Sequence, residues 1–87
     1  MAEPQMEVIG AVDGFFAKPS VAIVKLTAPL RVGDRIYVKG HTTDFQQAVE
    51  SMQVDHAAVP EAQAGQSVGV KVANRCRQHD VVYKLVG

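Results

Sequence analysis

Apolar and polar residues alternate with a period of two in several short stretches of the chain. The clearest example is 67–72, Ser-Val-Gly-Val-Lys-Val, and the stretch 35–39, Arg-Ile-Tyr-Val-Lys, repeats the pattern. This is the period of a strand with one buried face. Valine is far commoner than leucine, and β-branched side chains favour strands over helices. The pattern therefore predicts an all-β protein.

Six strands account for these stretches. In the fourth strand the apolar side changes between Val49 and Met52, so we expect a β-bulge near Glu50, because one extra residue reverses the facing of those that follow. Short strands at near-regular spacing are typical of a barrel, in which closure pairs every strand edge. We predict a small closed antiparallel six-stranded β-barrel, with strands at 6–16, 21–26, 35–39, about 45–54, 67–72 and 81–86.

The segments between these strands are short or irregular. Residues 55–66 are expected to form a loop with one helical turn, because Pro60 interrupts its few alanines. Residues 73–80 connect the last two strands, and residues 1–5 form a flexible leader to a single domain at 6–87. Gly33 and Asp34 predict a turn, since glycine supplies the backbone freedom and aspartate bonds to nearby amides.

Glycines and aromatic residues shape the first strand. Gly10 and Gly14 predict bends or close backbone approaches within 6–16. Phe15 and Phe16 are adjacent, and neighbours on a regular strand point to opposite faces. We therefore expect one of them to be exposed or to cover an end of the barrel.

Length and composition narrow the function classes. A chain of 87 residues holds one domain, and its nine Lys and Arg balance nine Asp and Glu. A single cysteine, Cys76, forms no internal disulfide, and no signal peptide or membrane-spanning stretch is evident. The sequence predicts a cytoplasmic protein that does not enter a membrane.

The residues that could carry chemistry do not form a recognised motif. No Gly-rich loop ends in Lys and Ser or Thr, so no phosphate-binding loop is present. His41, His56 and His79 with Cys76 lack the paired ligand spacing of structural zinc. Cys76 lies between two arginines, which favours a thiolate, but no base is paired with it by any motif. We predict no catalytic residue, no metal and no cofactor.

Cations are the better candidates for binding. Arg75 and Arg77 lie in the connection between the last two strands, where guanidinium groups could hold phosphate. The equally weighted alternative is a solvated loop whose charges pair with Asp80 or with the acidic first strand. The full set of predicted RNA- or partner-binding residues is Arg75, Arg77, Lys71 and Lys84, a second patch of Arg31, Arg35 and Lys39, and the aromatic Phe16.

Four segments carry a family resemblance: Leu-Arg-Val-Gly-Asp at 30–34, Ile-Tyr-Val-Lys-Gly at 36–40, Val-Glu-Ser-Met at 49–52 and Ala-Gln-Ala-Gly-Gln-Ser-Val-Gly-Val at 62–70. With them, the chain resembles the second domain of translational GTPases such as elongation factor Tu and initiation factor two. The resemblance implies a β-barrel that contacts transfer RNA or ribosomal RNA. Similar barrels also resemble the C-terminal domain of collagenase-like peptidases.

Three functions follow from these observations. The first is a non-catalytic translation-factor-like module that binds tRNA, ribosomal RNA or the ribosome through the cations. The second is an accessory domain that docks on a larger enzyme, such as a collagenase-like peptidase, through an apolar patch near Phe15, Phe16 and Pro19. The third is an enzyme that acts through Cys76, which a Cys76→Ser variant would test.

Overall fold

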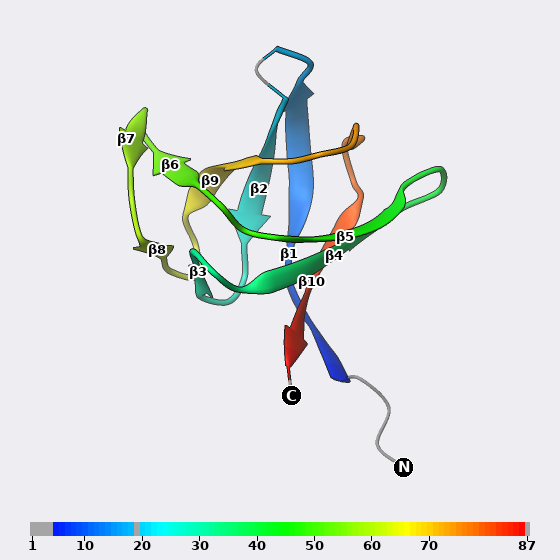
Figure 1. The fold of residues 1–87 in the computed structure, drawn as a ribbon, viewed down its shortest axis with the longest axis horizontal. Helices are drawn as coiled ribbons and strands as arrows, with labels where there is room; N and C mark the ends of the chain where they lie inside the picture. Colours follow the sequence, from blue (N-terminus) through cyan, green and yellow to red (C-terminus); the bar gives the residue numbers. More distant parts are fainter. Residues whose placement is uncertain (1–4, 19, 87) are drawn as a thin grey trace.

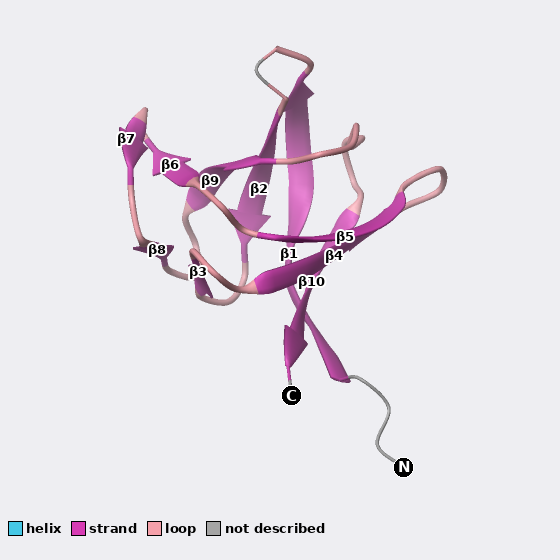
Figure 2. Cartoon of the chain, viewed as in Figure 1, coloured by secondary structure: helices cyan, strands magenta, loops and turns pink. Residues whose placement is uncertain are grey.

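The computed structural model describes residues 5–18 and 20–86, and within them it contains strands, turns and loops without a helix (Figure 2). The all-β prediction is confirmed. The structure has ten strands, several of them very short. Their bounds are β1 Gln5–Phe16, β2 Val21–Leu26, β3 Leu30–Arg31, β4 Arg35–Lys39, β5 Asp44–Ala48, β6 Met52–Val54, β7 Ala57–Ala58, β8 Glu61–Ala62, β9 Ser67–Lys71 and β10 Val81–Val86.

One antiparallel sheet of eight strands forms most of the molecule, in the order β5-β4-β10-β1-β2-β9-β6-β7, and β3 pairs separately with β8. The long β1 lies at the centre, and the sheet curls strongly around it (Figure 1). The start of β1 and the end of β10 lie at one end of the molecule, and the β1–β2 turn lies at the other.

The predicted bends of the first strand are confirmed. The register of β1 shifts between Val8 and Gly10 against β10, and again between Val12 and Gly14 against β2. A Cβ atom at Gly10 would lie 2.5 Å from the carbonyl oxygen of Lys25, so only glycine fits there. These bulges let one long strand take part in both halves of the curled sheet.

The predicted closed barrel is wrong, because the two sides of the sheet do not meet in a ladder. Across the seam, the side chain of Gln47 on β5 takes the place of a peptide group. Its Nε2 donates to the carbonyl oxygen of Lys71 at 2.8 Å, and its Oε1 accepts from the amide of Ala73 at 2.7 Å. One side chain therefore satisfies backbone groups that a closed barrel would pair strand to strand.

The predicted fourth strand, about 45–54, is also wrong, because it is two strands. The chain leaves the sheet after β5: the Val49 amide bonds to the carbonyl of Asp34, and the Gly33 amide bonds to the carbonyl of Val49. It then enters β6, which pairs with β9 and β7 instead of β4. The change of facing that indicated a bulge is a change of partner strand.

The predicted helical turn in 55–66 is wrong as well. This segment contains β7 and β8, and β8 pairs with the unpredicted β3 through Leu30 and Ala62. Of the predicted leader, residues 1–4 lie outside the described residues and Gln5 is the first residue of β1.

A core of small and branched side chains fills the inside of the curl. Leu30, Val68, Val70 and Val82 have no exposed surface. Burying each such side chain contributes about 1.5–3 kcal/mol. The described core residues are Ile9, Val12, Ala22, Val24, Leu26, Leu30, Ile36, Val38, Val49, Met52, Ala62, Val68, Val70, Val72, Cys76 and Val82.

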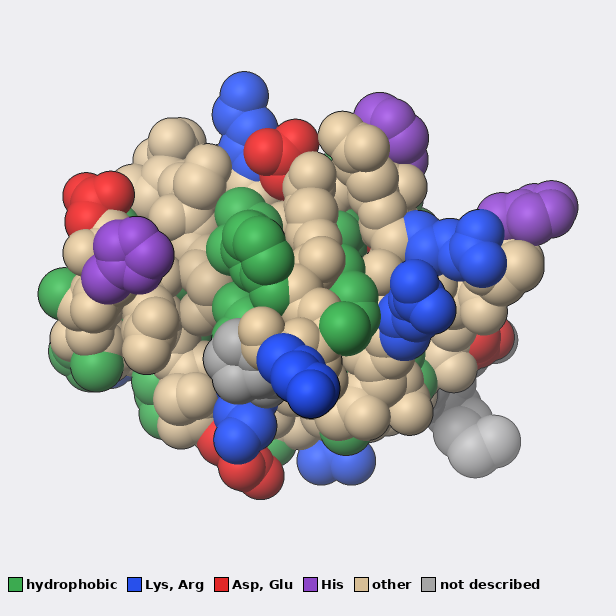
Figure 3. Space-filling model, turned by 90° about the horizontal axis from the view of Figure 1, so that it is seen from above, with side chains coloured by type: hydrophobic (Ala, Val, Ile, Leu, Met, Phe, Trp, Pro, Cys, Tyr) green, Lys and Arg blue, Asp and Glu red, His purple; other side chains and the backbone are tan. Residues whose placement is uncertain are grey.

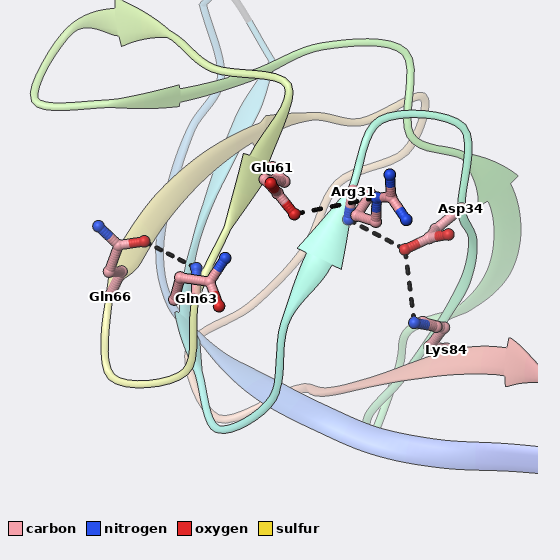
Figure 4. Close-up of polar contacts among 6 residues, drawn as sticks. All are labelled: Arg31, Asp34, Glu61, Gln63, Gln66 and Lys84. Carbon is pink, nitrogen blue, oxygen red and sulfur yellow. Dashed lines mark hydrogen bonds and ion pairs between the residues drawn. The ribbon is translucent and has the colours of Figure 1, made fainter.

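Two tight turns, each directly before a strand, contain the same pair of hydrogen bonds. In 31–34 the Asp34 amide donates to the carbonyl of Arg31 at 3.1 Å, and the Asp34 carboxylate accepts from the Arg31 amide at 2.9 Å. Gln63 and Gln66 make the same two bonds at 3.2 and 2.7 Å (Figure 4). The third residue is glycine with φ of 100° at Gly33 and 92° in 63–66, as a type II turn requires.

A third turn, 77–80, follows the same plan with other residues. The Asp80 amide donates to the carbonyl of Arg77 at 3.1 Å, and the Asp80 carboxylate accepts from the Arg77 amide at 2.8 Å. Its third residue is His79, with φ of 78°. Backbone bonds between His79 and Val12 and between Val12 and Asp80 fasten this turn to β1. A buried residue precedes each of the three turns, namely Leu30, Ala62 and Cys76.

Candidate functional site

Cys76 is a core residue. Its side chain is buried, and its Sγ lies 3.8 Å from the carbonyl oxygen of Asn74. Burial first, and then the nearby Asp80 carboxylate, raise the pKa of the thiol to about 11. The raised pKa favours the neutral thiol despite the flanking arginines, which disfavours the hypothesis of an enzyme acting through this thiol.

The histidines belong to loops and turns. His56 and His79 both have positive φ, 65° and 78°, at turn positions, and His41 lies in the β4–β5 loop. Among the residues that the structure describes, no three His, Cys, Asp or Glu side chains come together in a group that could hold a metal ion.

Arg75 and Arg77 lie beside a shallow depression of about 450 Å³ at the β1–β2 end, lined by Gly14, Phe15, Arg75, Cys76, Arg77 and Gln78. Phe15 packs partly against the core, whereas Phe16 is 58% exposed, which confirms that the pair points to opposite sides. Seen from this end, apolar side chains lie in the middle of the molecule, with Lys, Arg and His side chains and several Asp and Glu side chains around them (Figure 3). Pro19 lies outside the described residues.

Arg31 and Lys84 are separate from this loop and contact carboxylates. Lys84 Nζ lies 3.6 Å from Asp34 Oδ2, and Arg31 Nε lies 3.9 Å from Glu61 Oε2. Figure 4 shows both pairs around the 31–34 turn. These two cations therefore serve contacts between elements of the fold, although the exposed Arg31–Glu61 pair contributes little to stability.

Lys71 ends β9 beside the seam. It lines a depression of about 220 Å³ with Gln47, Ala48, Glu50, Val72 and Ala73. Within the seam its backbone carbonyl accepts a hydrogen bond from Gln47. The acidic Glu50 lies in the same lining, so this is a surface of mixed charge.

Arg35 and Lys39 lie on the outer face of β4, on the two sides of Tyr37, while Ile36 and Val38 face the core. Tyr37 stacks on Tyr83 of β10, with ring centroids 6.0 Å apart and an interplanar angle of 30°. The Tyr37 hydroxyl donates to Asp44 at 2.7 Å, and this bond, followed by burial, raises the pKa of Tyr37.

The predicted binding residues thus do not form one surface. Arg75 and Arg77 share a depression with Phe15, and Lys71 lies at the seam. Arg31 and Lys84 are in ion pairs, and Arg35 and Lys39 belong to the outer face of β4. Sequence reasoning missed the apolar residues of that outer face. The available signal was strand 81–86, which carries apolar residues on both of its faces.

In the described part of the chain, no helix is long and apolar enough to cross a membrane.

The fold is that of the C-terminal domain of a U32 peptidase. Two crystal structures of this domain from a Geobacillus thermoleovorans protein, described as a U32 peptidase, match with a TM-score of 0.83 and 23% identity. The match to the selenomethionine variant covers 87% of this chain and 96% of that domain. The match to the other structure covers 90% and 91%.

The sequence also matches part of a protein named as a protease. Over 78 residues, the chain is 42% identical to a protein of Methanocaldococcus jannaschii named as an uncharacterized protease. The match covers 88% of this chain and 19% of the protease, so the chain spans about one fifth of the length of this relative. No family model matches the sequence.

These findings correct the family prediction. The structural neighbours and the relative point to a U32 peptidase C-terminal domain, and the resemblance to the second domain of translational GTPases is wrong. The prediction of a translation-factor-like, RNA-binding module falls with it. The alternative, an accessory domain of a peptidase, fits the findings better.

Proposed function

We propose that this chain is a non-catalytic accessory domain that binds the catalytic part of a U32-type peptidase. The observation that carries the proposal is the pair of matches, in sequence to about one fifth of a named protease and in structure to the C-terminal domain of a U32 peptidase. A non-catalytic domain contributes to a peptidase by contact with the catalytic part or with its substrates.

The chemistry of the described residues supports a binding role. The buried thiol of Cys76 has a raised pKa, and peptide hydrolysis needs an activated nucleophile or a metal-bound water. His56 and His79 sit in turns and His41 lies in a loop. We therefore expect the isolated chain to show no peptidase activity, measured with unfolded protein and with gelatin as substrates.

Affinity capture tests the proposed partner. The tagged chain would be expressed in its own cells, captured after nuclease treatment and analysed by mass spectrometry. We expect one stoichiometric protein with a U32-type catalytic region. Capture of tRNA or ribosomal subunits in place of such a protein, or hydrolysis of peptides by the chain alone, would contradict the proposal.

A further inference from the structure

Cross-strand pairs define the outer face of β1, β10 and β4. Residues directly opposite each other in a ladder share a face of the sheet. Met6 pairs with Leu85, and Val8 pairs with Tyr83, which pairs in turn with Tyr37. These five residues form one continuous apolar surface, here called the outer patch.

The outer patch is open to solvent. Met6 is 47% exposed and Val8 is 52% exposed, and they are two of the four large hydrophobic residues that stand out as exposed in the described chain. The other three members of the patch are half-buried, and two of them, Tyr37 and Tyr83, stack on each other. Apolar residues exposed singly are common, but contiguous exposed ones mark interaction sites.

Cations frame the outer patch. A second row of paired residues crosses the same strands beside the patch. In it, Lys25 pairs with Ala11, Ala11 pairs with Val81, and Val81 pairs with Lys39. Arg35 lies on the same face of β4, two residues before Tyr37. All three cations are exposed. Asp44, opposite Lys39, is the acidic group that these pairs place on the same face, and it already accepts the Tyr37 hydroxyl.

This charge frame selects the occupant. A second copy placed patch to patch would bring Lys25, Arg35 and Lys39 against like charges, which costs several kcal/mol when they are close. A partner with an apolar centre and carboxylates at its edge would be attracted instead. We propose that the outer patch is where the chain docks on the catalytic part of a U32-type peptidase, through a partner surface of this composition.

The docking inference rests on the proposed function but adds a specific surface. The competing surface is the β1–β2 end near Phe16. There Phe15 turns toward the core and leaves Phe16 as the exposed large hydrophobic side chain of that pair. The outer patch presents five apolar residues in register, and a packed centre with a charged edge is the usual anatomy of a protein interface.

Matched variants test the outer patch with the captured peptidase as the probe. Val8→Glu places a charge in the centre of the patch at an exposed position, and we expect it to weaken binding at least tenfold. Arg35→Glu combined with Lys39→Glu reverses two of the three framing charges, and we expect slower association whose dependence on salt is reversed, because salt then screens a repulsion. Titration calorimetry and stopped-flow mixing would measure these changes.

Control variants separate the outcomes. Phe16→Glu, and Arg75→Glu with Arg77→Glu, should change the affinity less than twofold, and unchanged thermal unfolding would show that each variant is folded. If these controls lose the peptidase while the patch variants keep it, the docking inference is overturned and the proposed function stands. If size-exclusion chromatography finds a dimer that Val8→Glu dissociates, the occupant is a second copy and the inference is also overturned. If the unmodified chain captures no peptidase, the proposed function itself fails.

Discussion

The turns 31–34 and 77–80 make the same two hydrogen bonds in different surroundings. Asp34 is partly exposed and lies near Lys84, whereas Asp80 is 4% exposed and packs against Gly40. The first turn has glycine at its left-handed position, and the second has His79. The comparison shows that an aspartate close to basic residues in the sequence can accept a hydrogen bond from a backbone amide instead of pairing with their side chains. The connection that carries Arg75 and Arg77 therefore ends in a turn that backbone hydrogen bonds hold to β1.

The largest difference should appear when each turn loses its carboxylate. Asp80→Ala would leave the Arg77 amide without its acceptor in a buried place, and we expect a loss of about 2–3 kcal/mol in the free energy of unfolding. Asp34→Ala, the matched change, should cost about 1 kcal/mol because water reaches the freed amide. Urea unfolding measures both values, and equal losses would contradict the importance of burial.

The contact between Gly40 and Asp80 gives the next effect. A Cβ atom at Gly40 would overlap the Asp80 carboxylate, so Gly40→Ala should destabilise the protein by about 1–3 kcal/mol. In an Asp80→Ala background the overlap is gone and the same change should cost much less. A double-mutant cycle measures the coupling, and additive costs would show that the two residues do not act on each other.

Substitutions at the third position of each turn, where φ is positive, should change the stability of the protein in opposite directions. His79→Gly removes a side chain from a backbone conformation that glycine adopts without strain, and should stabilise the protein by about 0.5–1 kcal/mol. Gly33→Ala should destabilise it by a similar amount, because its φ is 100°. Thermal unfolding of both variants checks the prediction. A loss of stability in His79→Gly would show that the imidazole makes contacts that outweigh the strain.

Of the three residues that precede the turns, only Cys76 has a side chain that titrates, so the turns respond differently to high pH. Because the pKa of Cys76 is raised to about 11, the folded state favours the neutral thiol, and its contribution to stability is complete below pH 9 and falls as the pH rises toward 11. Cys76→Ala should flatten this decline. Tyr37, whose pKa is also raised, acts in the same direction, so Tyr37→Phe is the control. An unchanged decline in Cys76→Ala would exclude the thiol as its source.

The shared geometry of these turns also explains why the family predicted from the sequence was wrong. Gly33-Asp34 and the glycine-glutamine pair of 63–66 are solutions to one local problem, a type II turn whose last side chain bonds back to its first amide. Turn 77–80 reaches the same geometry without glycine. The segments therefore identify turns before strands and carry little information about ancestry.

Local rules predicted the strands and missed their long-range pairing. Alternation located 67–71 and 35–39 well, because burial on one face imposes a period of two. Barrel closure depends on which strands meet across the seam, and Gln47 gave no sign in sequence that its amide would replace a ladder. The outer patch was hidden for a similar reason, since Val8 faces solvent only because the register of β1 shifts directly after it.

The two hydrogen bonds that Gln47 makes across the seam affect where the native protein opens locally. A side-chain amide can swing away by rotating about its own χ angles, whereas a ladder must break several bonds together. The seam can therefore open without the loss of a strand ladder, and we expect the first local opening of the native protein there. Hydrogen exchange would register it as early labelling of the Ala73 amide, while the amides in the middle of β9 stay protected.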